Sequence, residues 1–248
     1  METMRRSAGK PIVIARGGAS AEAPEHTIAA FEAALAEGAD ALSLQVRLSR
    51  DGHPVAFGPA TLERTTDGRG TVGECTVREL KRLDAGGWKG LSFRGQRVQT
   101  LQEVLERFRD RTRFWVELPD GADAQSGIEE RVISTLEIYE AAERCLVQSA
   151  DPGALSRVRA LNPAVPLGAL WSAGSLASAM PAPGTVDALC AAVEVLEAAD
   201  VEQIRAAGLG CYVWTVNEPV LTDRLVGWRV DGILTDRPGL VRARISRT

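Results

Sequence analysis

The sequence of 248 residues is poor in the side chains that several kinds of site require. It contains two histidines and four cysteines, and none of the cysteines has C-x-x-C spacing. Cys145, Cys190 and Cys211 lie in apolar, strand-like runs, where a thiol packs as a small hydrophobic side chain, and Cys75 stands alone. We therefore expect neither a cysteine metal site nor redox chemistry.

Long apolar runs and an excess of positive charge are also missing. No stretch approaches the ~18 consecutive apolar residues of a transmembrane helix, and residues 1–10 contain no apolar core of a secretory signal. The net charge of −4 excludes a broad basic field that would hold nucleic acid or an anionic membrane. We expect a cytoplasmic protein without a nucleic-acid partner or a membrane span, and the oligomeric state stays open.

Short apolar runs alternate with longer amphipathic ones along most of the chain. Helical spacing begins after Thr27, a candidate N-cap, and ends near Gly38, a residue suited to close the last turn. The alternation predicts parallel strands joined by helices, in either a closed barrel or a doubly wound sheet. The expected strands are 11–15, 41–46, 54–57, 113–118, 145–149, 165–170, 187–193, 211–216 and 231–235, and later helices are expected within 76–84, 101–110, 128–140, 152–162, 201–209 and 219–228.

Two segments depart from this alternation. The turn at 49–53 leaves no room for a helix between two expected strands, and residues 58–99 form an insertion that could act as a lid or ordered loop. No linker divides the chain, and 172–185 is expected to be a surface loop. A single α/β domain over 1–248 fits the length of a (β/α)₈ barrel.

Several motifs follow one another in a recognisable order. Residues 15–35 read ARGGASAEAPEHTIAAFEAAL, and FWVELP, VWTVNEP and DGILTDRP follow at 114–119, 213–219 and 231–238. Together these motifs resemble the glycerophosphodiester phosphodiesterase family. The resemblance implies a TIM-type (β/α)₈ barrel with a small insertion after the third strand, and a role in lipid metabolism. It also implies phosphodiester hydrolysis by two histidines, acting as general acid and base, with a divalent cation held by three carboxylates.

The residues at the family's functional positions differ from that pattern. The two histidine positions fall on Ala15 and Gly58, and the three metal-ligand positions fall on Ser43, Gln45 and Glu117. Each general acid or base raises the reaction rate by roughly 10²–10⁴-fold. A hard cation needs several oxygen ligands. We therefore expect no confident catalytic residue and no divalent metal cofactor, provided that no other imidazole reaches the site.

The two histidines present offer little to replace the missing pair. His53 is expected in an exposed turn, about 16 Å from Gly58 at the rise of a strand, on the opposite face of the barrel. His26 begins the first helix, where a structural role competes with a catalytic one. His26 and Glu117 are the fallback catalytic candidates.

Other side chains at the expected strand ends could bind a ligand. Arg16 could hold a phosphate or pair with Glu25 or Glu117, which are themselves candidates. Trp171 and Trp214 could form a shared aromatic wall, and Asn217 could cap a helix. Ser149-Ala150 stands where the family often has Ser-Phe, so an aromatic wall of the substrate cleft is expected to be lost.

Three hypotheses for the function follow from these residues. The first is a pseudoenzyme that has lost metal-dependent hydrolysis and binds a phosphorylated or polar small ligand or a protein partner. The second is an enzyme with altered, metal-independent chemistry around Arg16, Glu25, His26 and Glu117. The third is a weak residual glycerophosphodiester phosphodiesterase.

Overall fold

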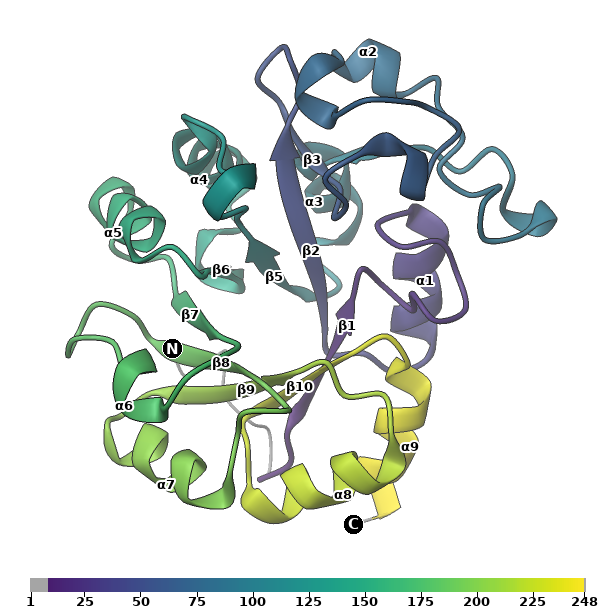
Figure 1. The fold of residues 1–248 in the computed structure, drawn as a ribbon. Coiled ribbons are helices and arrows are strands. Elements are labelled where there is room, and N and C mark those ends of the chain that lie inside the picture. Colours follow the sequence, from purple (N-terminus) through teal and green to yellow (C-terminus); the bar gives the residue numbers. More distant parts are fainter. Residues whose placement is uncertain (1–8, 248) are drawn as a thin grey trace.

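Eight parallel strands close into a barrel in the computed structural model, which describes residues 9–247 (Figure 1). Each strand is hydrogen-bonded to the next, and the last pairs with the first. This closure confirms the barrel and excludes the doubly wound sheet. The expectation about a secretory signal falls mainly on residues 1–8, outside the described residues. The strands are β1 (Ile12–Arg16), β2 (Ala41–Leu48), β5 (Arg113–Glu117), β6 (Cys145–Ser149), β7 (Leu167–Trp171), β8 (Ala188–Ala192), β9 (Gly210–Trp214) and β10 (Gly232–Thr235).

Helices cover the outside of the barrel. Thr27 caps the first by accepting the Ala30 N–H, and Gly38 follows its end with φ +85°, as predicted. None of the helices in residues 9–247 is long and apolar enough to cross a membrane. The helices are α1 (Ile28–Ala36), α3 (Leu101–Phe108), α4 (Ile128–Ile138), α5 (Pro152–Leu161), α6 (Leu176–Ala179), α7 (Ala198–Ala206), α8 (Pro219–Trp228) and α9 (Pro238–Arg247).

A small hairpin extends β2 beyond the barrel. β3 (Pro54–Ala56) pairs antiparallel with β2, and β4 (Gln99–Thr100) pairs antiparallel with β3. β4 has only two residues, too few to produce a periodic signal. Because β3 runs back toward the barrel, the exposed His53 lies at the outer end of the hairpin, past the carboxyl end of β2. The expectation that His53 lies on the opposite face of the barrel is therefore wrong.

The insertion 58–99 is ordered around its own small core. It contains α2 (Val77–Leu80), and Leu62, Val72 and Leu80 pack with Phe57 inside it. Figure 1 shows it in blue beside α1 and the β1–α1 loop. Arg64 Nη2 lies 2.7 Å from Glu25 Oε1 in that loop, and Lys89 Nζ donates to the Ser20 carbonyl at 2.7 Å. The insertion therefore lies against the loop that follows the first strand.

The barrel interior is filled by large side chains. Trp115 and Tyr212 meet edge to face with ring centroids 5.2 Å apart, and Ile14, Leu146 and Cys190 belong to the same buried cluster. Burial raises the pKa of the Cys190 thiol, as it does for the other two buried cysteines, Cys145 and Cys211. These thiols are packing groups, as expected, and the filled interior leaves space for a ligand at the carboxyl end of the strands.

Candidate functional site

A cavity of about 170 Å³ opens at the carboxyl ends of the barrel strands, a region called the barrel mouth below. Polar side chains from β1, β2, β5 and β6 form one side, and apolar side chains from β7, β9 and β10 form the other. This division suits a ligand with a charged end and a less polar remainder. The lining residues are Arg16, Gly17, His26, Ser43, Gln45, Glu117, Gln148, Leu170, Trp214 and Leu234.

The β1–α1 loop brings His26 back over β2. Gly17 and Gly18 adopt positive φ values of +64° and +89°, which favour glycine. A Cβ atom on Gly18 would lie 2.5 Å from the carbonyl carbon of Ala30, so the loop can pack this tightly only with glycine there. Gly17 N–H donates to the Ser43 carbonyl at 2.7 Å, and His26 N–H donates to the Gly17 carbonyl at 2.9 Å.

His26 is held as a neutral hydrogen-bond donor. Its ring is buried, and Nε2 accepts the backbone N–H of Gln45 at 3.1 Å, which assigns the ring proton to Nδ1. Nδ1 is buried without a hydrogen-bond partner in the described part of the chain. Desolvation lowers the pKa of His26 to about 4, helped by the positive charges of Arg16 and Arg64 and opposed by Glu25. An imidazole therefore does reach the barrel mouth. The expectation of no catalytic residue and no metal assumed that no other imidazole reaches the site, and this assumption is wrong.

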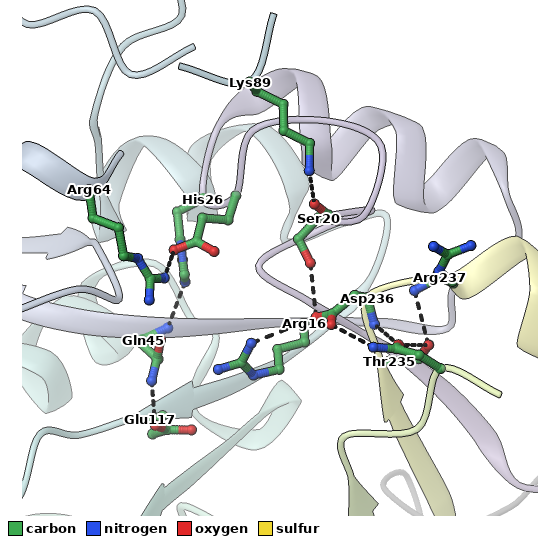
Figure 2. A network of polar contacts seen from close by, with 12 residues as sticks. Arg16, Ser20, His26, Gln45, Arg64, Lys89, Glu117, Thr235, Asp236 and Arg237 are labelled. Carbon is green, nitrogen blue, oxygen red and sulfur yellow. Dashed lines mark hydrogen bonds and ion pairs between the residues drawn. The ribbon is translucent and has the colours of Figure 1, made fainter. Parts of the chain in front are cut away.

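Glu117 is held by two amides. Its Oε1 accepts Gln45 Nε2 at 2.7 Å, and its Oε2 accepts Gln148 Nε2 at 2.9 Å. Figure 2 shows Gln45 between His26 and Glu117, with the Arg16 guanidinium extending toward the same space. Glu117, the only carboxylate that lines the cavity among residues 9–247, is thus oriented by neutral side chains from the two neighbouring strands.

Arg16 has a different partner from those expected. Its Nη1 lies 3.7 Å from Asp236 Oδ1, and its side chain is 40% exposed. Glu25 pairs with Arg64 instead, and Glu117 with the two glutamines, so both expected pairings of Arg16 are wrong. A single long ion pair leaves most of the guanidinium donors available to a ligand.

Asp236 belongs to a network that the sequence did not reveal. It accepts Ser20 Oγ at 3.0 Å and Asn217 Nδ2 at 2.8 Å, while Asn217 Oδ1 accepts Thr235 Oγ1 at 3.0 Å. Asn217 was expected to cap a helix, but its side chain joins the ends of β9 and β10. The position of Asp236, directly after a barrel strand, could have indicated this network. Thr235 pairs in register with Ala15, so Asp236 is level with Arg16 on the neighbouring strand.

The two positions where the resemblance implies histidines are Ala15 and Gly58. Ala15 is buried in β1. A Cβ atom on Gly58 would lie 2.3 Å from Gln45 Oε1 and 3.2 Å from His26 Cε1. The side chains of Gln45 and His26 therefore occupy the space that a larger residue at position 58 would enter.

The two tryptophans have separate locations. Trp214 lines the cavity and donates Nε1–H to the Cys190 carbonyl at 2.9 Å. Trp171 packs outside the barrel with Leu176, and its Nε1 donates to the Ala173 carbonyl at 3.0 Å. Leu170 lines the cavity, and alternation along the strand then turns Trp171 outward, so the shared aromatic wall is wrong.

Gln148 lines the cavity, although the sequence motif pointed to its neighbour Ser149. The register of the barrel pairs Gln148 with Glu117, so strand alignment could have placed it at the site. Ser149, the next residue, points away from the barrel mouth.

The chain is similar to proteins of one family over almost all of its length. The model of the glycerophosphoryl diester phosphodiesterase family matches residues 17–240. A glycerophosphodiester phosphodiesterase of Caldanaerobacter subterraneus is 35% identical, covering 92% of this chain and 95% of that protein. One from Bacillus subtilis is 31% identical, covering 92% and 84%. The structure of an Oleispira antarctica phosphodiesterase with the product sn-glycerol-3-phosphate has a TM-score of 0.85 at 28% identity, covering 96% and 97%.

These matches correct the expectation that no divalent metal is used, because members of the matched family generally depend on a divalent cation. Within residues 9–247 no three His, Cys, Asp or Glu side chains cluster closely enough to hold a metal ion. The cavity still offers oxygen donors of the kind that hard cations prefer: the Glu117 carboxylate, the Ser43 hydroxyl and Gln148 Oε1, which is buried without a partner among the described residues. With matches of this extent, the chain belongs to the glycerophosphoryl diester phosphodiesterase family.

Proposed function

We propose that the barrel mouth binds a small phosphorylated ligand, such as a glycerol phosphate or a glycerophosphodiester, and that the chain has lost efficient acid–base hydrolysis. The observation that carries this proposal is the Arg16 guanidinium, which lines the cavity. Its side chain is 40% exposed, and its ion pair with Asp236 is long at 3.7 Å.

A phosphoryl group suits the Arg16 guanidinium. The planar guanidinium matches two phosphate oxygens, and such charge-assisted bonds are stronger than neutral ones. The product complex of the Oleispira antarctica phosphodiesterase supports the ligand class, since that protein shares this fold.

The burial of His26 and its hydrogen bond with Gln45 make it unsuited to proton transfer. A general base needs a free lone pair and a pKa near the working pH. The lone pair of Nε2 already accepts the Gln45 N–H, and the low pKa keeps the ring neutral. Among the described residues Glu117 is the one carboxylate lining the cavity, whereas the resemblance implies a reaction that uses both an acid and a base. The residues of the cavity therefore bind and orient a ligand better than they exchange protons with it.

Glu117, Ser43 and Gln148 would hold a divalent cation, which when bound would supply positive charge to the phosphoryl group. Arg16 would bind the ligand from the β1 side.

A weak glycerophosphodiester phosphodiesterase is the second candidate. It is favoured by the 35% identity to a protein that carries this name, over 92% of the chain.

Two measurements on the full chain separate the candidates. Calorimetry with sn-glycerol-3-phosphate should show binding that Arg16→Gln weakens about tenfold or more, since a charge-assisted hydrogen bond contributes ~1.5–3 kcal/mol. Arg78→Gln, an exposed change on α2, should leave the affinity unchanged.

In the second measurement, glycerophosphocholine with Mg²⁺, Ca²⁺ or Mn²⁺ should give no turnover above background. Chelator-sensitive turnover that is lost in Glu117→Gln would establish the second candidate instead.

A further inference from the structure

A larger cavity, of about 440 Å³, lies on the outer side of β7 between α5 and α6; it is called the outer groove below. No charged side chain is present among the described residues that line it, whereas the barrel mouth contains Arg16 and Glu117. The groove therefore suits an uncharged and mainly apolar group. Its lining residues are Ser149, Ala150, Pro152, Leu155, Ser156, Ala169, Leu170, Ser178, Ala179, Met180, Pro181, Ala182, Thr185 and Val186.

The groove results from the short crossover between β7 and β8. α6 has four residues, whereas α5 has ten and α7 has nine, so α6 cannot cover the outward face of β7. Small side chains at Ala150, Ala169 and Ala179 leave the space open. Figure 1 shows the short α6 beside β8 and β9, with a long connection back to the barrel. The hollow is thus part of the fold and does not depend on one rotamer.

The outer groove and the barrel mouth are neighbours across β6 and β7. Leu170 lines both cavities. Gln148 lines the barrel mouth and Ser149, the next residue, lines the groove, because successive side chains of a strand point to opposite sides. The two spaces therefore approach each other at the strand tips, where the exposed Ala150 follows β6.

We infer that the outer groove receives the uncharged chain of a phosphoester whose phosphate lies in the barrel mouth. This inference rests on the proposed phosphate binding and makes it more specific: phosphoesters with a single alkyl or acyl chain are the preferred ligands. The phosphate contacts Arg16, the chain passes over the tips of β6 and β7 beside Ala150, and its end packs on Ala169 and Leu155.

A series of n-alkyl phosphates tests this inference by calorimetry on the full chain. Ethyl, butyl, hexyl and octyl phosphate are used below their micelle-forming concentrations, with sn-glycerol-3-phosphate as the reference without a chain. Once the chain is long enough to enter the groove, the affinity should rise about two- to fourfold for each added methylene, the gain typical of burying that group.

Two substitutions that fill the groove show whether the gain arises there. Ala150→Phe narrows the entrance from an exposed position, so it leaves the fold intact, and Ala179→Phe fills the α6 wall. Both should abolish the dependence on chain length and leave the affinity for sn-glycerol-3-phosphate unchanged. Ala164→Phe, an exposed change in the loop before β7, should keep the dependence.

The outcomes separate this inference from the proposed function. If neither sn-glycerol-3-phosphate nor any alkyl phosphate binds, phosphate binding itself is refuted. If sn-glycerol-3-phosphate binds but affinity does not change with chain length, only the role of the groove is refuted. A gain that persists in both Phe variants would place the chain elsewhere. A dimer that Ala150→Phe dissociates, with no chain-length effect, would assign the groove to a second copy.

Discussion

At the scale of single residues, Gln45 and Gly58 depend on each other. Gln45 reaches Glu117 through Nε2, and its Oε1 lies 2.3 Å from the position that a Cβ atom on residue 58 would take. A side chain at position 58 would therefore force the Gln45 side chain, which holds Glu117, to move. The residues at positions 45 and 58 are thus physically coupled.

This coupling predicts non-additive stability. Gly58→Ala should lower the free energy of unfolding by about 1–2 kcal/mol, because Gln45 must move and release Glu117. In the Gln45→Ala background the same change should cost little. A double-mutant cycle in urea measures the difference, and a coupling energy below about 0.5 kcal/mol would contradict the arrangement.

The buried, neutral His26 predicts acid sensitivity. Burial lowers the pKa of His26 from its ordinary value of 6.5 to about 4 in the folded chain. Between these values the unfolded chain binds a proton that the folded chain does not, so stability should fall as the pH is lowered through this window. The contribution reaches about 2–3 kcal/mol near pH 4.

His26→Asn should remove this part of the acid dependence, as measured by chemical denaturation between pH 7 and 4. His53→Asn is the matched control, because the exposed His53 ring is hydrated in both states. Equal acid dependence in the wild type and His26→Asn would refute the neutral state of the ring.

At the scale of elements, the β1–α1 loop decides where the donors lie. It begins directly after Arg16 and carries His26 near its end, and the insertion contacts it through Lys89 and Arg64. Gly18 lets the loop pack against the first turn of α1. The positions of Arg16 and His26 therefore depend on a loop that packs against α1 on one side and against the insertion on the other.

Two glycine substitutions separate the packing of this loop from backbone strain. Gly18→Ala should cost roughly 3 kcal/mol or more, because its Cβ would meet the Ala30 backbone at 2.5 Å in addition to the strain of a positive φ. Gly184→Ala has a positive φ of +78° with nothing within 4 Å, and should cost only about 1 kcal/mol. Thermal unfolding compares the variants, and equal losses would show that packing at Gly18 is unimportant.

At the scale of the whole molecule, the closed barrel links ligand binding to global stability. A ligand at about 100 times its Kd adds ~2.7 kcal/mol to the free energy of unfolding. For a domain of this size, each kcal/mol raises Tm by roughly 2–4 °C. sn-Glycerol-3-phosphate should therefore raise Tm by about 5–10 °C, and no shift at saturating concentration would refute phosphate binding.

A divalent cation should strengthen this effect. Mn²⁺ and sn-glycerol-3-phosphate together should raise Tm by more than the sum of the two separate shifts, because a cation at Glu117 would attract the phosphate. Glu117→Gln should make the two shifts additive. An unchanged excess in Glu117→Gln would place the cation at other ligands.

Local patterns were sufficient for the alternation of strands and helices, because each element repeats a period that its own residues carry. They left a closed barrel and a doubly wound sheet open, and the resemblance to the family implied the barrel. Nine strands were predicted, and the tenth, β4, is too short to show a period. The direction of β3 was not encoded in its residues: His53 reaches the outer end of a hairpin only because β3 pairs antiparallel with β2. The inward or outward direction of Trp171 likewise follows from the register of the whole barrel.

The order of residues along the chain established the family motifs and the strand–helix alternation. Three-dimensional packing decided that His26 lines the cavity as a neutral donor, that Glu117 is held by Gln45 and Gln148, and that Arg16 pairs with Asp236. The reason is distance in sequence: these contacts join strand tips up to 220 residues apart, and only closure of the barrel brings them within hydrogen-bond reach.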